Sequence, residues 1–233
     1  MSPTKASFAE SVRDSLKEIF DPKKTPWVFL VVTLTAIVVQ LNPGSQSRLI
    51  YDRTAVAQGE IWRLWTGHLV HFGWPHFIAD AGLFLILGRL LERQHPIASY
   101  VSLIGMPLAI AVAMYWGDPS MVRYGGLSAV NFGLLVFLAL QGWQRNWIDW
   151  FWPVVFSIYV LEIVVEAKSR HGTGGGMIQF NDPSVRVATV AHIGGAIFGA
   201  FLWATGFLKN IFPAAPASRK DAVSKNKSAR WKQ

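Results

Sequence analysis

Long apolar runs separated by short polar segments make up most of the chain from residue 27 onwards. A membrane-spanning helix needs about 20 predominantly apolar residues, and six runs come close to this length or exceed it. They cover residues 27–41, 64–91, 97–116, 128–143, 150–165 and 185–208. The first run is short, so we expect flanking residues to extend it, and no small-residue cleavage site follows it. The pattern predicts an all-α membrane protein with six transmembrane helices.

The two ends of the chain are polar and differ from each other. Residues 1–24 carry apolar side chains spaced by three or four positions, which is the pattern of an amphipathic helix on a membrane surface. Residues 209–233 are rich in Pro, Ala, Lys and Ser, a composition typical of a disordered tail. We therefore expect an amphipathic segment at 1–24, a membrane domain at 25–208 and a basic tail at 209–233.

Composition agrees with a membrane protein, and charge orients it. Hydrophobic residues make up 52% of the chain and charged residues 15%, whereas a soluble domain carries about 25% charged residues. The formal net charge is +8, and the tail contributes +6 through seven Lys and Arg residues against one Asp. Six spans place both termini on one side, and basic flanks stay in the cytoplasm, so both termini are expected to be cytoplasmic. A net charge that lies mostly in the tail argues against nucleic acid as a partner, and the lack of cysteine excludes disulfides and thiolate nucleophiles.

Ionisable side chains interrupt two of the apolar runs. The second run contains His68, His71, His76 and Asp80, and the sixth contains His192. Such groups are costly inside a membrane and usually face a partner or a water-filled cavity. The six-span topology brings the first half of the second run and the starts of the fourth and sixth runs to one level near the outer face. We expect these side chains to form one site there.

Ser128 opens the fourth run, directly after Tyr124-Gly125-Gly126-Leu127. As a helix N-cap, its side chain would accept a backbone N–H bond. As a nucleophile, it would give its proton to His192, and the resulting oxyanion would lie near the positive end of a helix. His76 and the Ser128 backbone N–H would then stabilise the oxyanion, each donor contributing about 3 to 4 kcal/mol. The two interpretations are compatible, and the histidines at the same level favour the nucleophile.

Four motifs resemble those of the rhomboid intramembrane serine proteases in order and spacing, over about residues 59–206. They are Trp62-Arg63, His71-x-x-x-x-His76-x-x-x-Asp80, Gly126-Leu127-Ser128-Ala129 with Phe132, and Ala191-His192-x-x-Gly195-x-x-x-Gly199. The resemblance implies a rhomboid-like bundle of six transmembrane helices. It also implies a serine endopeptidase that cleaves a membrane-anchored protein in or next to its transmembrane segment, in the lipid bilayer and without cofactor or metal.

The resemblance further implies a role for each matching residue. Ser128 would be the nucleophile and His192 the general base, without a third carboxylate, and His76 would donate a hydrogen bond to the oxyanion. Phe132 would stack against the His192 ring. The remaining matches would support the site: Asp80, His71 and Gly126 beside the oxyanion, Gly195 for close helix packing, and Trp62-Arg63 to brace the outer loops.

Two positions depart from the usual rhomboid pattern. Ala129 follows the serine where many rhomboids have glycine. Asp80 stands at the place of the oxyanion-hole asparagine, and an ionised carboxylate only accepts hydrogen bonds. Either burial keeps the Asp80 carboxyl protonated, or the carboxylate orients His76 instead.

With Asp80 at this position, the sequence resembles the rhombosortase branch of the family. Asp80, the Tyr-x-Gly-Leu-Ser start at Tyr124 and the compact six-span layout all point to this branch. Rhombosortases are associated in Gram-negative bacteria with the removal of C-terminal glycine-glycine sorting tails from exported proteins. The resemblance thus implies a multi-pass protein of the bacterial inner membrane, with its active site opening towards the periplasmic face.

Two other functions remain open. The cluster of His68, His71, His76, Asp80 and His192 contains helical positions four apart, which can ligate a transition metal in a membrane hydrolase or oxidase. Against a metal, the sequence has no H-E-x-x-H motif, and a metal site leaves the glycine-flanked serine unexplained. The other alternative is a non-catalytic rhomboid-like binding protein, which the intact serine and histidine disfavour.

Four ionisable residues have simpler interpretations. His68 is expected at the membrane interface, and His71 is expected to hydrogen-bond the loop that follows Asn42. Glu162, deep in the fifth run, is expected to bond to a neighbouring helix. His171 lies in the glycine-rich loop 166–183 and is expected to be solvated.

Overall fold

The computed structural model describes residues 25–145, 153–157 and 188–211, together with single positions at 10, 13, 14, 17, 160, 161 and 164. Most of the predicted amphipathic segment and of the basic tail lies outside the described residues. The same holds for Glu162, for His171 with its loop, and for half of the fifth predicted span.

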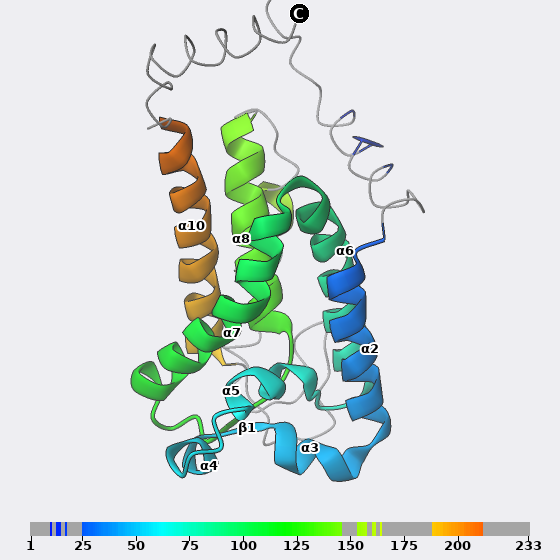
Figure 1. Ribbon diagram of the computed structural model, residues 1–233, viewed down its shortest axis with the longest axis vertical. Coiled ribbons are helices and arrows are strands. Elements are labelled where there is room, and N and C mark those ends of the chain that lie inside the picture. The colour runs from blue at the N-terminus through cyan, green and yellow to red at the C-terminus, as the bar shows by residue number, and fades with distance from the viewer. Residues whose placement is uncertain are drawn as a thin grey trace, which may run out of the picture.

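Five long helices form the body of the described part of the chain. They are α2 (Trp27–Leu41), α6 (Trp74–Gln94), α7 (Pro96–Gly117), α8 (Ser128–Arg145) and α10 (Thr189–Ile211). α10 runs beside α8, α2 packs against α6, and α7 crosses over α8 and α10 (Figure 1). Within the described part of the chain, α6, α7 and α10 are long and apolar enough to cross a membrane. The chain is mostly helical, as predicted, while the count of six spans stays a prediction.

α2 coincides with the first predicted span and is not extended at its C-terminal end. The chain instead bends by 116° at Asn42 into the short helix α3 (Pro43–Leu49). Pro43 has no N–H to continue the hydrogen-bond ladder of α2, and its ring suits the first turn of a new helix. A fourth span among the described helices is counted only if this bent pair is taken as one.

The second predicted span, 64–91, is not one helix, and this prediction was wrong. Its first part forms α5 (Arg63–Thr66) and a 3₁₀ turn, η1 (Gly67–Leu69), and α6 begins only at Trp74. The break has a local cause: Gly73 has φ 105°, a left-handed conformation that glycine adopts without strain. Because of this break, His68 and His71 precede α6 and do not lie on its first half.

Short elements gather at one end of the bundle, at the bottom of Figure 1. Besides α3 and α5 they include α4 (Arg53–Ala57) and two antiparallel strands, β1 (Tyr51–Asp52) and β2 (Arg123–Tyr124). The strands pair Tyr51 with Tyr124 and Asp52 with Arg123. This pairing ties the segment after α3 to the segment that leads into α8.

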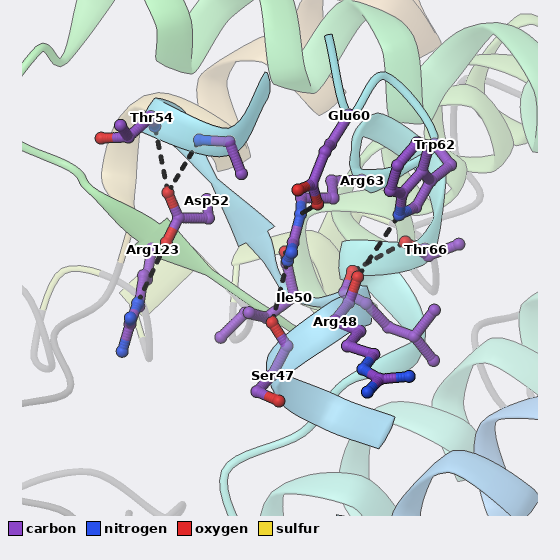
Figure 2. A network of polar contacts seen from close by, with 12 residues as sticks. Ser47, Arg48, Ile50, Asp52, Thr54, Glu60, Trp62, Arg63, Thr66 and Arg123 are labelled. Carbon is purple, nitrogen blue, oxygen red and sulfur yellow. Dashed lines mark hydrogen bonds and ion pairs between the residues drawn. The ribbon is translucent and has the colours of Figure 1, made fainter. Parts of the chain in front are cut away.

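Arg63 and Trp62 hold the turns of this end together, as the motif implied (Figure 2). The buried Arg63 guanidinium donates from Nη1 to the carbonyl oxygens of Ser47 at 3.0 Å and Ile50 at 2.8 Å. The Trp62 indole N–H donates to the carbonyl of Arg48 at 3.3 Å. The two side chains therefore satisfy carbonyl groups that irregular backbone would otherwise leave without partners.

α8 and α10 approach each other through glycines. A methyl group added at Gly195 would collide with the carbonyl of Ala129, and one at Gly199 would collide with the carbonyl of Gly133. Only glycine fits where two helix backbones come this close. The contact at Ala129 fixes α10 against the first turn of α8, which begins at Ser128.

Candidate active site

Ser128 is the first residue of α8, and the backbone before it is shaped by two glycines. Gly126 has φ 117°, and a Cβ there would lie 2.9 Å from His76 Cε1 and 3.0 Å from Asp80 Oδ2. A Cβ at Gly125 would lie 2.7 Å from the carbonyl oxygen of Val70. The glycines are needed because the loop before the serine lies directly on the side chains of α6 and on the segment before it.

The peptide groups of this loop have specific partners. The Gly126 carbonyl accepts a hydrogen bond from the Tyr124 hydroxyl at 3.1 Å, and His68 Nδ1 lies 3.1 Å from the same oxygen. The Leu127 N–H donates to Asp80 Oδ2 at 2.8 Å.

The buried Asp80 carboxylate is the centre of the polar cluster. Besides the Leu127 N–H, its Oδ2 faces His76 Nε2 at 3.1 Å and His71 Nε2 at 3.4 Å. The Phe72 N–H donates to His76 Nδ1 at 3.3 Å, so in a neutral His76 ring the proton is on Nε2, which points at Asp80. Asp80 Oδ2 thus accepts from the Leu127 N–H and from the Nε2–H of a neutral His76, and the His71 ring lies beside the same oxygen.

His71 differs from expectation. It was predicted to hydrogen-bond the loop that follows Asn42, but its Nδ1 lies 3.3 Å from the carbonyl of Leu69, two residues away. Its Nε2 instead faces Asp80, and its ring lies edge-on to His76 with 5.2 Å between centroids. His71 is therefore part of the Asp80 cluster and not of the contacts near Asn42.

His192 lies on α10, in the turn that precedes Gly195, and is 5% exposed. Its Nδ1 lies 3.0 Å from the carbonyl oxygen of Ala188. A carbonyl only accepts, so Nδ1 carries the proton, and Nε2 of the neutral ring holds the lone pair that a general base needs. His192 is also close enough to Asp80 and His76 to interact with them electrostatically.

Phe132 contacts His192 differently from the stacking that the resemblance implied. The two ring centroids are 6.0 Å apart and the planes make an angle of 65°, so the contact is edge-on. Phe132 instead stacks on Phe156, with 5.5 Å between centroids and 1° between planes. Phe132 thus contacts both the His192 ring and the helical segment 153–157.

Two further buried residues lie at the site, His68 and Tyr124, and the favoured sequence interpretation gave neither of them a role in the chemistry. His68 was expected at the membrane interface but is 3% exposed, and burial lowers its pKa to about 4. Tyr124 is 5% exposed, and burial raises the pKa of its hydroxyl. The two rings meet edge-on with 5.4 Å between centroids. The segments that carry them are far apart in sequence, so no spacing in the chain could reveal their contact.

The cluster does not have the geometry of a metal site in the part of the chain that the structure describes. No group of three or more His, Asp or Glu side chains there is arranged to hold an ion. His71 and His76 instead direct their Nε2 atoms at one carboxylate oxygen of Asp80.

Fold and site together define a helical membrane protein in which a serine at a helix start lies beside a buried cluster of histidines and one aspartate. The Rhomboid domain matches residues 58–209, which is more than half of the chain. The protein belongs to the rhomboid family, which is known for intramembrane serine proteases and also has inactive members. No curated protein matches the chain.

Proposed function

We propose that this rhomboid is an active intramembrane serine endopeptidase, with Ser128 as the nucleophile and His192 as the general base. The observation that carries the proposal is the bond of His192 Nδ1 to the Ala188 carbonyl. It selects the tautomer in which Nε2 accepts a proton, and it does so without the third carboxylate of a triad. Ala188, the residue directly before α10, takes the orienting role of that carboxylate.

The placement of His192 relative to Ser128 follows from helix packing. Gly195 lies against the Ala129 carbonyl, and His192 precedes Gly195 by three residues. Residues three apart share a helix face, so His192 is on the side of α10 that faces the start of α8. Ser128 is the neighbour of Ala129, which supports a pairing of the two side chains.

The reaction needs only groups that the chain supplies. Ser128 Oγ attacks the carbonyl carbon of the substrate peptide bond while its proton passes to His192 Nε2. His192 then gives this proton to the leaving amine, and the substrate acyl group stays on Ser128 as an ester. A water molecule activated by His192 hydrolyses the ester and restores the serine hydroxyl.

Asp80 stands where the usual rhomboid pattern has the asparagine of the oxyanion hole, and a carboxylate there can orient a donor without donating itself. In our proposal its carboxylate is ionised and orients His76, because Oδ2 already accepts from the Leu127 N–H. The donors to the oxyanion are the Ser128 backbone N–H at the start of α8 and the single Nε2–H of His76, which is shared between Asp80 Oδ2, at 3.1 Å, and the oxyanion. Gly126 and His71 support this arrangement, Gly126 by its close approach and His71 by its contact with the same carboxylate.

We further propose the rhombosortase-like form of this activity. The protein would remove a C-terminal sorting tail from an exported, membrane-anchored protein at the periplasmic side of the bacterial inner membrane. This form rests on Asp80 and on the Tyr124-to-Ser128 segment. The cytoplasmic segment 1–24 and the tail 209–233 belong to the same proposal, since the basic tail orients the bundle.

The first test is covalent labelling of the purified protein by a serine-directed fluorophosphonate. We expect one labelled site that is lost in Ser128→Ala and retained in Ser120→Ala, a control serine in the exposed turn before β2. Ser128→Ala and His192→Ala should both abolish cleavage of a membrane-anchored substrate. Near wild-type turnover in either variant would refute the dyad.

The labelling experiment also separates the alternatives. A folded wild-type protein that binds membrane proteins but never reacts would be a non-catalytic member of the family. Stoichiometric zinc or iron, with activity abolished by chelation, would point to a metal-dependent enzyme. The substrate is then sought by mass spectrometry of protein C-termini in cells with Ser128 intact or replaced by Ala.

A further inference from the structure

Asn131 takes no part in the proposed mechanism, although it lies on α8 only three residues after Ser128. From Ala129 to Leu140 it is the only residue with a polar side chain, and it is 0% exposed. A polar side chain in such apolar surroundings is costly in a membrane protein, and it usually has a partner that matters for function. The partner of Asn131 is therefore informative.

Three hydrogen bonds join Asn131, Leu127 and Asp80 in a closed loop. The Asn131 side chain donates from Nδ2 to the main-chain carbonyl of Asp80 on α6 at 2.9 Å. The Asn131 backbone N–H donates to the Leu127 carbonyl at 2.8 Å, and the Leu127 N–H donates to the Asp80 carboxylate at 2.8 Å. The start of α8 therefore binds Asp80 twice, once at its main chain and once at its side chain.

The bond from Asn131 to Asp80 is made at a cost to stability. Asn131 Oδ1 is buried and has no hydrogen-bond partner among the described residues. The Asp80 carbonyl can only accept, so the amide cannot turn over to exchange Oδ1 and Nδ2 without loss of the bond. A leucine branches at the same carbon and would leave no polar side-chain atom unpaired. Stability alone therefore does not account for an amide at this position.

The residue that Asn131 holds is also the residue that orients the oxyanion donor. Asp80 Oδ2 lies 3.1 Å from His76 Nε2, and the two residues are four apart on α6. Residues four apart share a helix face, so a shift of α6 against α8 would move His76 and Asp80 together relative to Ser128. Asp80 is 2% exposed and Asn131 0%, so solvent does not compete for the bond between them.

We propose that Asn131 is a positioning residue, which fixes the Asp80 main chain against the first turn of α8 and so keeps His76 and the Ser128 backbone N–H directed at one oxyanion. The inference rests on the proposed function. In the proposed reaction no bond to Asn131 is made or broken, and its effect on the rate passes through Asp80. Donors that are displaced from the oxyanion lose much of their effect, because catalysis depends on their placement before the reaction.

The first test removes the amide in two ways in the full chain, reconstituted in lipid vesicles. Asn131→Leu fills the site and Asn131→Ala leaves it partly empty, so either variant serves if the other does not fold. We expect both to lower the fluorophosphonate labelling rate of Ser128 and kcat by about 3- to 10-fold with KM unchanged, the effect of one neutral hydrogen bond. Ser102→Ala is the matched control and should change none of these, because Ser102 is 0% exposed and donates only to the Ala98 carbonyl of its own helix, at 2.7 Å.

The second test is a double-mutant cycle that separates positioning from a general loosening of α8. Asp80→Ala keeps the carbonyl that Asn131 binds and suits a helix, but it has no carboxylate to position. We expect replacement of Asn131 to lower the labelling rate in the wild-type background and to have little further effect in Asp80→Ala. Equal losses in both backgrounds, or unchanged kinetics in the Asn131 variants, would overturn the role of Asn131 alone. A wild type that never labels at Ser128 would overturn the proposed function and this inference together.

Discussion

The backbone N–H of Leu127 donates a hydrogen bond to the Asp80 carboxylate, with 2.8 Å between the two atoms. This bond joins α6 to the residue directly before Ser128, and it is made by a group that can only donate. The carboxylate oxygen therefore acts as an acceptor in the folded protein. The finding favours the second of the two sequence interpretations of Asp80, in which the ionised group orients its neighbours.

Asp80→Asn tests this role directly. The amide oxygen can still accept from the Leu127 N–H, but a neutral group holds His76 less strongly than a carboxylate does. We expect a fall in kcat of about tenfold, since hydrogen bonds to charged groups contribute about 1.5 to 3 kcal/mol. Asp118→Asn, in the turn after α7, is the control for loss of one negative charge. Retained or raised activity in Asp80→Asn would mean that a neutral donor suffices at this position.

Gly126→Ala is expected to disrupt both stability and activity. Alanine at φ 117° is strained, and its Cβ would press on His76 and Asp80 at about 3 Å. Gly59→Ala is a matched control, because Gly59 has φ 101° but nothing within 4 Å of the added Cβ. Backbone strain alone costs about 1 to 2 kcal/mol, so thermal unfolding should show a moderate loss for Gly59→Ala and a larger one for Gly126→Ala. Equal losses, with activity retained in both, would show that the close approach at Gly126 is not needed.

Gly195→Ala is expected to separate α10 from α8. The added methyl group would collide with the Ala129 carbonyl, whereas at Gly206, on the same helix, nothing lies within 4 Å. Overpacking of a tight contact costs about 1 to 3 kcal/mol, and displacement of His192 should also reduce fluorophosphonate labelling of Ser128. Gly206→Ala should leave both the stability and the labelling of Ser128 unchanged. Unfolding in lipid vesicles, followed by circular dichroism, and the labelling rate measure the two effects.

His68 makes stability depend on pH. Burial lowers its pKa to about 4 in the folded protein, from 6.5 for the free side chain. The unfolded chain therefore binds a proton first as pH falls, so stability is complete above about pH 6.5, declines towards pH 4 and is constant below it. The loss amounts to at most about 3 kcal/mol. His68→Gln keeps an amide donor for the Gly126 carbonyl. In this variant, stability should change less with pH between pH 6.5 and pH 4 than it does in the wild type.

The contribution of His68 is measured as the difference between the curves of stability against pH for the wild type and for His68→Gln. Burial also lowers the pKa of His95, at the turn between α6 and α7, so the wild type and the variant share that contribution. Parallel curves from pH 6.5 to pH 4 would show that His68 does not titrate as proposed.

Much of the helical layout could be predicted because it depends on local sequence. α2 has the predicted bounds 27–41, and α8 begins at Ser128, where glycines precede an apolar run. The second run shows the limit of this reasoning. Hydropathy continues through Gly73 and Pro75, so composition alone could not place the break that separates His71 from α6.

The sequence by itself determined which chemistry the chain carries: a serine at a helix start, histidines and an aspartate in apolar surroundings, and the motifs that place it among rhomboids. Only the tertiary structure decided how these groups are paired. Whether the Leu127 N–H meets Asp80 and whether His68 meets the Gly126 carbonyl depend on distances between segments that are remote in the chain. Residue type sets what a side chain can donate or accept, whereas the packing of α6, α8 and α10 sets which partner it meets.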